Sequence, residues 1–428
     1  MRDWLYRRKY RKIQRKFDRC FKNMRMDVSA CDIEICKLAD KIYQSHKSEF
    51  HAPTTNGCDA GFFASVLYET GGHTVSMLNG LESLAEDMSI HVFCSKKAET
   101  QSGAPGVVAR IRKCAKFDGL ECPGHDFVHD LIELYNMIAD DCPRVAFIFI
   151  HMWDLLFTAV MHLLKQNTGL KIIFSNHASH FPNVGMTLAD IILEGMPTTQ
   201  QITENKRHLH NCRIIGLQSV GINDTKYYSR SEINAKKKEL SIPLRAPLTV
   251  SGGSAYKFFD GDASPYFEMI RDILHSKPTL HHMVISNPDK SQSMLIDKIF
   301  ENDTAARARL HIVPLTPDFD LLFQCADVFI DSFPVSSAMT QIDLMRMRIA
   351  SVVKINRDKP IYSFHEYMPA DYPYMYDNVA DMRRGIEHLL DNGDARRAVI
   401  DSEYEYWIKN YERSAFKCKY KNIIKELV

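Results

Sequence analysis

The stretch that decides the fold runs from Ala326 to Val353 and centres on residues 331–343, D-S-F-P-V-S-S-A-M-T-Q-I-D. A strand-like run, Ala326–Ile330, precedes it; a helix-like run, Ile342–Arg346, ends it; a second strand-like run, Ala350–Val353, follows. Such a strand, loop and helix start can hold a nucleotide diphosphate, because N–H groups at a helix N-terminus and small hydroxyls bind phosphate. An ordinary connection capped by serines explains the same residues equally well.

Length and composition narrow the class of protein. The chain has 428 residues, 45% hydrophobic and 25% charged, which is typical of a globular protein with two domains. A net charge of +1 excludes a general polyanion binder. No apolar run is long enough to span a bilayer, and the N-terminus lacks the apolar core of a secretory signal. Eleven cysteines without a C-x-x-C pattern indicate reduced thiols, so we expect a cytoplasmic protein.

The N-terminal residues 1–30 are predicted to form a basic amphipathic helix. Eleven Lys and Arg residues lie among the first 25, against Asp3 and Asp18. Apolar residues recur there at mostly helical spacing: Trp4, Ile13, Phe17, Phe21 and Met24. Such a helix suits an anionic membrane surface, on the inner membrane face. The alternative is a helix packed on its own domain. We expect no nucleic-acid partner, because no further basic stripe accompanies it.

The rest of the chain alternates strand-like and helix-like runs. In residues 55–235, Phe62–Tyr68 is predicted to be a buried strand and Val75–Glu86 a helix. The alternation begins again in residues 245–400, and residues 401–428 are predicted to form a C-terminal helix. This pattern predicts an α/β fold of two tandem Rossmann-like, doubly wound domains that face a cleft.

Several candidate residues lie at the ends of predicted strands, where ligands bind in such sheets. In the first domain, Gly72 and His73 follow the first strand, and His151 and His177 follow later ones. Glycine allows close approach to a ligand, and histidine can relay protons or hydrogen-bond a sugar. His177 and His180 form an H-x-x-H pair without further ligands, so we expect no metal site.

The second domain places a lysine at the equivalent position. Tyr256 and Lys257 follow its first strand across a Gly-Gly turn, and the ammonium could neutralise a leaving diphosphate. Ser336 and Ser337 supply the small hydroxyls of the loop, and Asp343 could accept hydrogen bonds from a ribose.

Taken together, these motifs resemble the catalytic half of O-linked N-acetylglucosamine transferases and their relatives. Those proteins have a Gly-x-His turn, matched by Gly71–His73, and a Tyr-Lys pair, matched by Tyr256 and Lys257. Their donor loop is close to D-T-F-P-x-N-G-G-T-T-T-L-D-A-L, which corresponds to residues 331–345. The turn at Gly71–His73 and the Asn176-His177 segment also resemble bacterial surface-polysaccharide transferases of the same fold. In this chain, Ser336-Ser337-Ala338 replaces Asn-Gly-Gly and Met339 replaces the first Thr.

The resemblance implies an inverting, metal-independent transferase of the GT-B fold that uses a nucleotide-sugar donor, a UDP-sugar, without a cofactor. Residues 245–400 would bind the donor, with Lys257 at the diphosphate, Thr340 at a phosphate and Asp343 at the ribose. Residues 55–235 would bind a glycan or lipid-linked acceptor. Two alternatives remain open: a protein O- or N-glycosyltransferase, and an inactive module that binds a sugar nucleotide or a partner.

Overall fold

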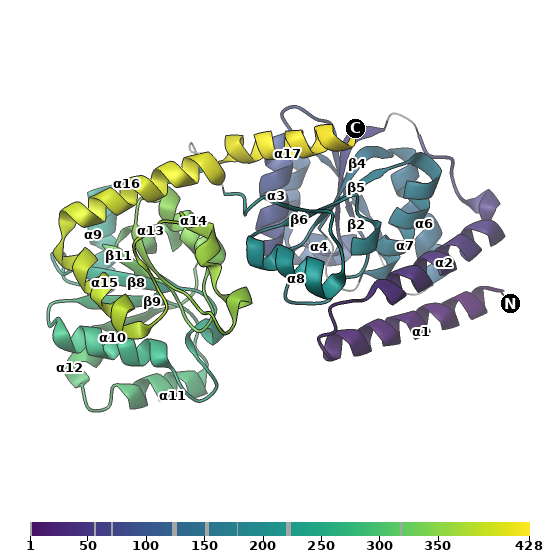
Figure 1. Ribbon diagram of the computed structural model, residues 1–428. Coiled ribbons are helices and arrows are strands. Elements are labelled where there is room, and N and C mark those ends of the chain that lie inside the picture. The colour runs from purple at the N-terminus through teal and green to yellow at the C-terminus, as the bar shows by residue number, and fades with distance from the viewer. Residues whose placement is uncertain are drawn as a thin grey trace. The chain divides into compact units, whose positions relative to one another are not determined.

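The computed structural model describes residues 2–54, 57–69, 72–121, 126–149, 154–177, 179–219, 224–316 and 319–428. The chain divides into two compact units (Figure 1). The first consists of Met1–Gln218 and Phe416–Val428, and the second of Ser219–Ala415. Each unit contains a parallel sheet covered by helices, which confirms the predicted α/β class with two Rossmann-like domains.

The first unit has a sheet in the order β3-β2-β1-β4-β5-β6-β7. Its strands are β1 (Cys58–Ala64), β2 (Ile90–Cys94), β3 (Lys116–Gly119), β4 (Pro143–Ile148), β5 (Lys171–Ser175), β6 (Ile191–Glu194) and β7 (Cys212–Ile214). All neighbouring strands run parallel. They are strongly apolar because a parallel sheet is buried on both faces.

Helices flank this sheet, and the first two helices of the chain pack on other helices. The helices are α1 (Arg2–Lys22), α2 (Ser29–Ser45), α3 (Gly72–Leu84), α4 (Lys97–Gly103), α5 (Pro105–Cys114), α6 (Phe127–Asp140), α7 (Leu155–Thr168) and α8 (Pro197–Arg207). α2 packs on α7, and α1 packs on α2 and α6. Among the described helices, none combines the length and the apolar content of a transmembrane span.

The first strand differs from the predicted one. We expected a strand at Phe62–Tyr68, and the structure has β1 at Cys58–Ala64. Beyond Ala64 the chain leaves the strand, and two of the following backbone donors bind side chains instead of a neighbouring strand: Leu67 N–H donates to Thr100 Oγ1 and Tyr68 N–H to Thr74 Oγ1. The apolar run therefore continues past the strand into a buried loop.

The second unit has a sheet in the order β10-β9-β8-β11-β12-β13. Its strands are β8 (Leu248–Gly252), β9 (His281–Ile285), β10 (Leu310–Val313), β11 (Val328–Ile330), β12 (Ala350–Lys354) and β13 (Met375–Tyr376). Its helices are α9 (Arg230–Glu239), α10 (Pro265–Ser276), α11 (Lys290–Ile299), α12 (Thr304–Arg307), α13 (Phe319–Gln324), α14 (Ala338–Arg346), α15 (Val379–Asp391) and α16 (Gly393–Asn410).

The segment expected as one C-terminal helix, 401–428, is divided in two. α16 ends at Asn410 and α17 (Arg413–Leu427) begins after a break in which the Glu412 carboxylate accepts the Ser414 N–H at 2.7 Å. Most of α17 belongs to the first unit. There Tyr420 is buried against Phe147 of β4, with ring centroids 5.5 Å apart.

Both sheets change winding direction at their first strand. β1 lies between β2 and β4, and β8 lies between β9 and β11. Ligands of doubly wound sheets bind outside the carboxyl ends of the strands at such a switch point. The β1/β4 ends and the β8/β11 ends are therefore the places where each unit is expected to bind a ligand.

Candidate functional site

The switch point of the second unit brings Lys257 against the loop after β11. Lys257 lies in a 3-10 turn, Ala255–Phe258, that follows β8. Its Nζ donates to the Ser336 carbonyl oxygen at 3.2 Å and to Ser337 Oγ at 3.1 Å. Burial lowers the pKa of the ammonium, and the charge of Asp331 opposes that shift. The structure thus joins two segments that are about 80 residues apart in sequence.

Gly253 permits this close approach. Its φ is +152°, and a Cβ placed there would lie 2.9 Å from Ser337 Oγ and 3.1 Å from Lys257 Cδ. A larger residue would force the Ser337 and Lys257 side chains to shift, and its backbone would be strained at this φ, so glycine suits this position on both counts.

A buried carboxylate holds the loop of Ser336 and Ser337. Asp331 is 0% exposed at the end of β11; it accepts from Ser336 Oγ at 2.6 Å and from the Ser337 N–H at 3.2 Å. Gln341 Nε2 donates to Ser336 Oγ at 2.9 Å. Burial raises the pKa of the Asp331 carboxyl to about 6, against the opposing effect of these donors and of Lys257.

The two serines consequently have structural partners. Ser336 Oγ donates to Asp331, and Ser337 Oγ donates to the Gly252 carbonyl oxygen at 3.1 Å. Both side chains are buried. In this structure the serine hydroxyls close the loop, and the groups that remain for an anion are the Lys257 ammonium and the N-terminal amides of α14.

α14 starts directly after Ser337 and carries the other two donor-site candidates. Thr340 lies half-buried in its first turn. Asp343 lies one turn further on and accepts a hydrogen bond from Arg346, whose Nε lies 2.9 Å from Asp343 Oδ1. The Nη2 atom of Arg346 donates to Asp320 Oδ1, also at 2.9 Å. Burial raises the pKa of Asp343, and Arg346 opposes the rise. The ribose candidate is therefore already part of an ion-pair network.

Tyr256 presents its ring to solvent beside Lys257. The residue is 61% exposed, although partial burial of the hydroxyl raises its pKa. An exposed aromatic ring next to an anion site can contact a base or a sugar.

A buried polar chain beneath this site was not predicted. Tyr266 OH donates to Ser251 Oγ at 2.5 Å and lies 2.8 Å from His282 Nε2, and Ser251 Oγ donates to the Ile330 carbonyl oxygen at 2.5 Å. Burial lowers the pKa of His282 to about 3, so the ring is neutral. The chain ties α10 and β9 to the ends of β8 and β11. The sequence signals for it were polar residues inside buried strands, Thr249 and Ser251 in β8 and His282 in β9.

In the first unit, the β1/β4 switch point brings His73 and His177 together. Their ring centroids are 4.2 Å apart. His73 Nε2 forms a short hydrogen bond with the carbonyl oxygen of Phe149, just after β4. Because a carbonyl oxygen only accepts, Nε2 carries the hydrogen, and the neutral ring has its lone pair on Nδ1. Gly72 is exposed at the start of α3, and a Cβ there would meet open space.

A buried network fixes the segment that carries His177. Asn176 Nδ2 donates to Glu194 Oε1 at 2.8 Å, and Thr203 Oγ1 donates to the same oxygen at 2.6 Å. Arg207 Nη2 donates to the Ser179 and Phe181 carbonyl oxygens, both at 2.8 Å. Burial raises the pKa of Glu194 and lowers that of Arg207 to about 10.

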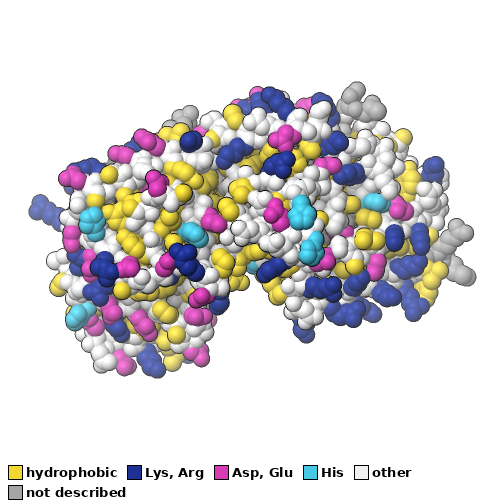
Figure 2. Space-filling model, viewed as in Figure 1, with side chains coloured by type: hydrophobic (Ala, Val, Ile, Leu, Met, Phe, Trp, Pro, Cys, Tyr) yellow, Lys and Arg dark blue, Asp and Glu magenta, His cyan; other side chains and the backbone are white. Residues whose placement is uncertain are grey.

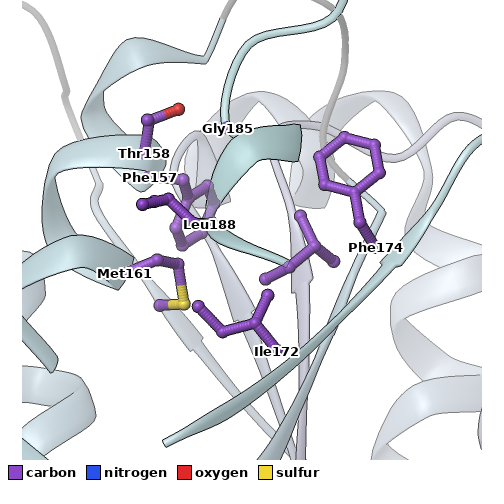
Figure 3. A pocket seen from close by; sticks show the side chains of 8 residues that line it. Phe157, Thr158, Met161, Ile172, Phe174, Gly185 and Leu188 are labelled. Atoms are coloured by element: carbon purple, nitrogen blue, oxygen red, sulfur yellow. The ribbon is translucent and has the colours of Figure 1, made fainter. Parts of the chain in front are cut away.

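Two places in the first unit remain: the predicted His151 and a small pocket. His151 lies outside the described residues. A small pocket lined by α7, β4 and β5 holds apolar side chains and the Thr158 hydroxyl, as Figure 3 shows for Phe157, Met161 and Ile172. It contains no acid, base or cation. Among the described residues, no group of three or more His, Cys, Asp or Glu is arranged to hold a metal ion.

Comparison with known proteins identifies the fold. No family model matches the sequence, and no curated protein sequence matches it. Solved structures do match. A glycosyltransferase from Rickettsia africae aligns with a TM-score of 0.68 and 10% identity over 86% of this chain and 98% of that one. The chain has the GT-B fold. The fold-level resemblance inferred from the sequence is thereby confirmed.

Two further structures share the fold. HepE from Anabaena, solved in complex with UDP-glucose, aligns with a TM-score of 0.62 and 9% identity over 86% of this chain and 99% of that one. An O-GlcNAc transferase from Thermobaculum terrenum aligns with a TM-score of 0.58 and 12% identity over 97% of this chain and 76% of that one.

Proposed function

We propose that this protein is a glycosyltransferase that moves a sugar from a nucleoside-diphosphate sugar, a UDP-sugar, to a lipid-linked or surface glycan without a metal ion. One observation carries the proposal: the Lys257 ammonium lies beside the N-terminus of α14 at the β8/β11 switch point. The complex of HepE with UDP-glucose supports the choice of nucleotide.

The donor chemistry follows from the charges at this place. Transfer breaks the bond between the anomeric carbon and a phosphate oxygen, and negative charge develops on the leaving diphosphate. A fixed ammonium and the amides of a helix N-terminus stabilise that charge more strongly than that of the intact donor. We assign the phosphates to Lys257 and Thr340 and the ribose to Asp343. Ser336 and Ser337 act by shaping the loop.

The acceptor is assigned to the first unit. An acceptor hydroxyl must lose a proton as it attacks the anomeric carbon, and we assign the uptake of this proton to the imidazole of His73. His177, whose ring lies against that of His73, and His151 complete the proposed acceptor site. The choice of a lipid-linked or surface glycan rests on the basic helix α1, which would bring the enzyme to the cytoplasmic face of the inner membrane.

One alternative has an observation in its favour. The Ser336 and Ser337 hydroxyls are engaged inside the protein, which suits a module that binds a sugar nucleotide without turnover. Modification of a peptide hydroxyl or amide would instead indicate a protein O- or N-glycosyltransferase.

The test is a thermal-shift screen with UDP, GDP, CMP, ADP and dTDP, with and without EDTA, followed by calorimetric titration of the nucleotide that binds. We expect UDP to raise the melting temperature in EDTA. Lys257→Met should weaken UDP binding roughly 10- to 150-fold, the effect of a lost charged hydrogen bond of about 1.5–3 kcal/mol. Lys277→Met, which removes a surface lysine paired with Asp391, is the matched control.

Three outcomes decide between the readings. Equal losses for uridine and UDP in Lys257→Met would contradict a diphosphate contact. Binding with neither hydrolysis nor transfer of UDP-sugars would favour the binding module. No shift with any nucleotide would remove the donor assignment altogether.

A further inference from the structure

The inner side of α1 is already occupied by protein. Ile13 and Phe17 are buried, and Tyr10 stacks on Phe127 of α6 with ring centroids 4.0 Å apart. Phe21 stacks on Phe181 at 5.4 Å. Of the apolar residues that the sequence offered for insertion into a bilayer, Ile13, Phe17 and Phe21 therefore pack on the first unit, as the alternative expectation required. Trp4 and Met24 are exposed.

The outer side of α1 is a row of cations. Arg8, Lys12, Arg15 and Arg19 are exposed at positions i, i+4, i+7 and i+11 and so share one face of the helix. Arg11 and Lys22 flank them. Figure 2 shows dark-blue side chains gathered where Figure 1 draws α1.

Few carboxylates neutralise this row. The ion pairs that α1 makes with described residues join Arg7 to Asp126, Lys16 to Glu34 and Asp3 to His46. None of them involves the six cations of the outer side. That side is about 30 Å long, since α1 has 21 residues at about 1.5 Å each.

One end of the row is aromatic and apolar. Trp4 is 61% exposed and Leu5 47% exposed, in the first turn of α1. The Arg8 guanidinium lies 5.6 Å from the centre of the Trp4 ring. Tryptophan favours the headgroup level of a bilayer, where its ring is partly buried and its N–H stays hydrated.

We infer that the outer face of α1 docks the protein on the anionic lipid headgroups of a bilayer. The attachment is electrostatic, with Trp4 and Leu5 as a shallow anchor, because the remaining apolar side chains of the helix are committed to the fold. A straight row of cations with an apolar end matches a flat charged interface better than a nucleic-acid groove. This inference deepens the proposed function, because the choice of a lipid-linked acceptor rests on the same helix, whereas UDP binding by the second unit does not depend on it.

The experiment is co-sedimentation of the full chain with vesicles of phosphatidylcholine alone and with added phosphatidylglycerol, at low and at physiological salt. The test variant changes Arg8, Lys12, Arg15 and Arg19 to Gln, which retains helix propensity. The control variant changes four exposed lysines elsewhere to Gln: Lys113, Lys238, Lys290 and Lys298. Both variants lose four positive charges.

We expect binding to anionic vesicles only, weakened by salt. Each headgroup-facing cation contributes roughly a fivefold factor in partitioning, so the α1 variant should bind several hundredfold more weakly, on the order of four such factors. The control should lose less than tenfold, and Trp4→Ala should weaken binding several-fold. Unchanged melting temperatures would show that the variants are folded.

The inference fails if the two quadruple variants lose binding equally, since net charge alone would then explain it. It also fails if neutral vesicles bind as well as anionic ones. Absence of vesicle binding together with α1-dependent binding of an RNA or DNA duplex would overturn it in favour of a nucleic-acid surface. None of these outcomes bears on UDP binding, so this surface and the donor site are tested separately.

Discussion

Replacing Asp331 with Asn should flatten the pH dependence of folding. Burial raises the pKa of this carboxyl to about 6 in the folded protein, against an ordinary value of 3.8 in the unfolded chain. Between these values the folded state holds the extra proton, so the free energy of unfolding falls as the pH rises. The stability that the protonated carboxyl provides is present below pH 3.8 and is lost as the pH rises through 6. An amide does not titrate, so D331N removes this contribution.

The size of the effect follows from the two pKa values. A pKa of about 6 against 3.8, at about 1.36 kcal/mol per pKa unit, corresponds to about 3 kcal/mol in total. About 2 kcal/mol of this is lost between pH 4.5 and pH 7.5. Asp331 is fully buried, so solvent screening does not reduce the figure much. Relative to D331N, the native protein should lose about 2 kcal/mol over that pH interval.

Urea unfolding followed by tryptophan fluorescence measures this difference. Trp407 is fully buried in α16 of the second unit, and the chain has three tryptophans. Trp4→Phe and Trp153→Phe in both proteins make Trp407 the reporter. Asp371→Asn, which removes an exposed carboxylate of the same unit, is the control and should parallel the native protein.

The reasoning would be refuted if the native protein and D331N gave parallel curves of stability against pH. A native protein that gained stability relative to D331N as the pH rose would refute it as well, because Asp331 would then have a lowered pKa.

Two further predictions concern the proposed reaction. His73→Gln should lower kcat on the order of 10²- to 10⁴-fold and leave UDP affinity unchanged, because it removes the proposed acceptor-side base and belongs to the first unit, whereas the donor is assigned to the second. His275→Gln, on the exposed surface of α10, is the control, and an unaltered kcat in His73→Gln would exclude the base assignment. Gly253→Ala should destabilise the second unit by about 1–3 kcal/mol and also weaken UDP binding, because its Cβ would meet Ser337 and Lys257. Gly261→Ala is the control: its φ is also positive (+60°), but the added Cβ would meet open space, so it should lower stability without affecting UDP binding. Equal UDP binding in the two variants would argue against Gly253 as a spacer.

Local sequence was sufficient to predict the strand, loop and helix that carry the proposed donor residues. A strand, a loop and a helix follow one another within residues 326–353, and the lysine after β8 meets that loop because parallel strands end at one edge of a sheet. The role of the serines could not be foreseen. Whether a serine hydroxyl faces a ligand or a buried carboxylate depends on where Asp331 points, and one partner, Gly252, lies 85 residues away.

Periodicity had similar limits at the two ends of the chain. It predicted an apolar stripe on α1, but the same stripe can bury itself in a bilayer or against a protein surface, and periodicity does not distinguish the two. At the C-terminus the helical periodicity of the sequence continues across the break at Tyr411 and Glu412, because the apolar residues of α17 again have helical spacing. They pack in the first unit, whereas α16 belongs to the second. The division between α16 and α17 follows from non-local packing rather than from local preference.

The return of α17 to the first unit sets an order of events during synthesis. The first unit is completed by residues 416–428, which leave the ribosome only after the whole of Ser219–Ala415 has been made. At about 5–20 residues per second, that interval lasts roughly 10–40 seconds. Throughout it, Phe147 of β4 lacks the Tyr420 ring that later packs against it. The nascent first unit therefore exposes apolar surface while the second one folds, and chaperones that shield such surface should influence its yield more than that of the second unit.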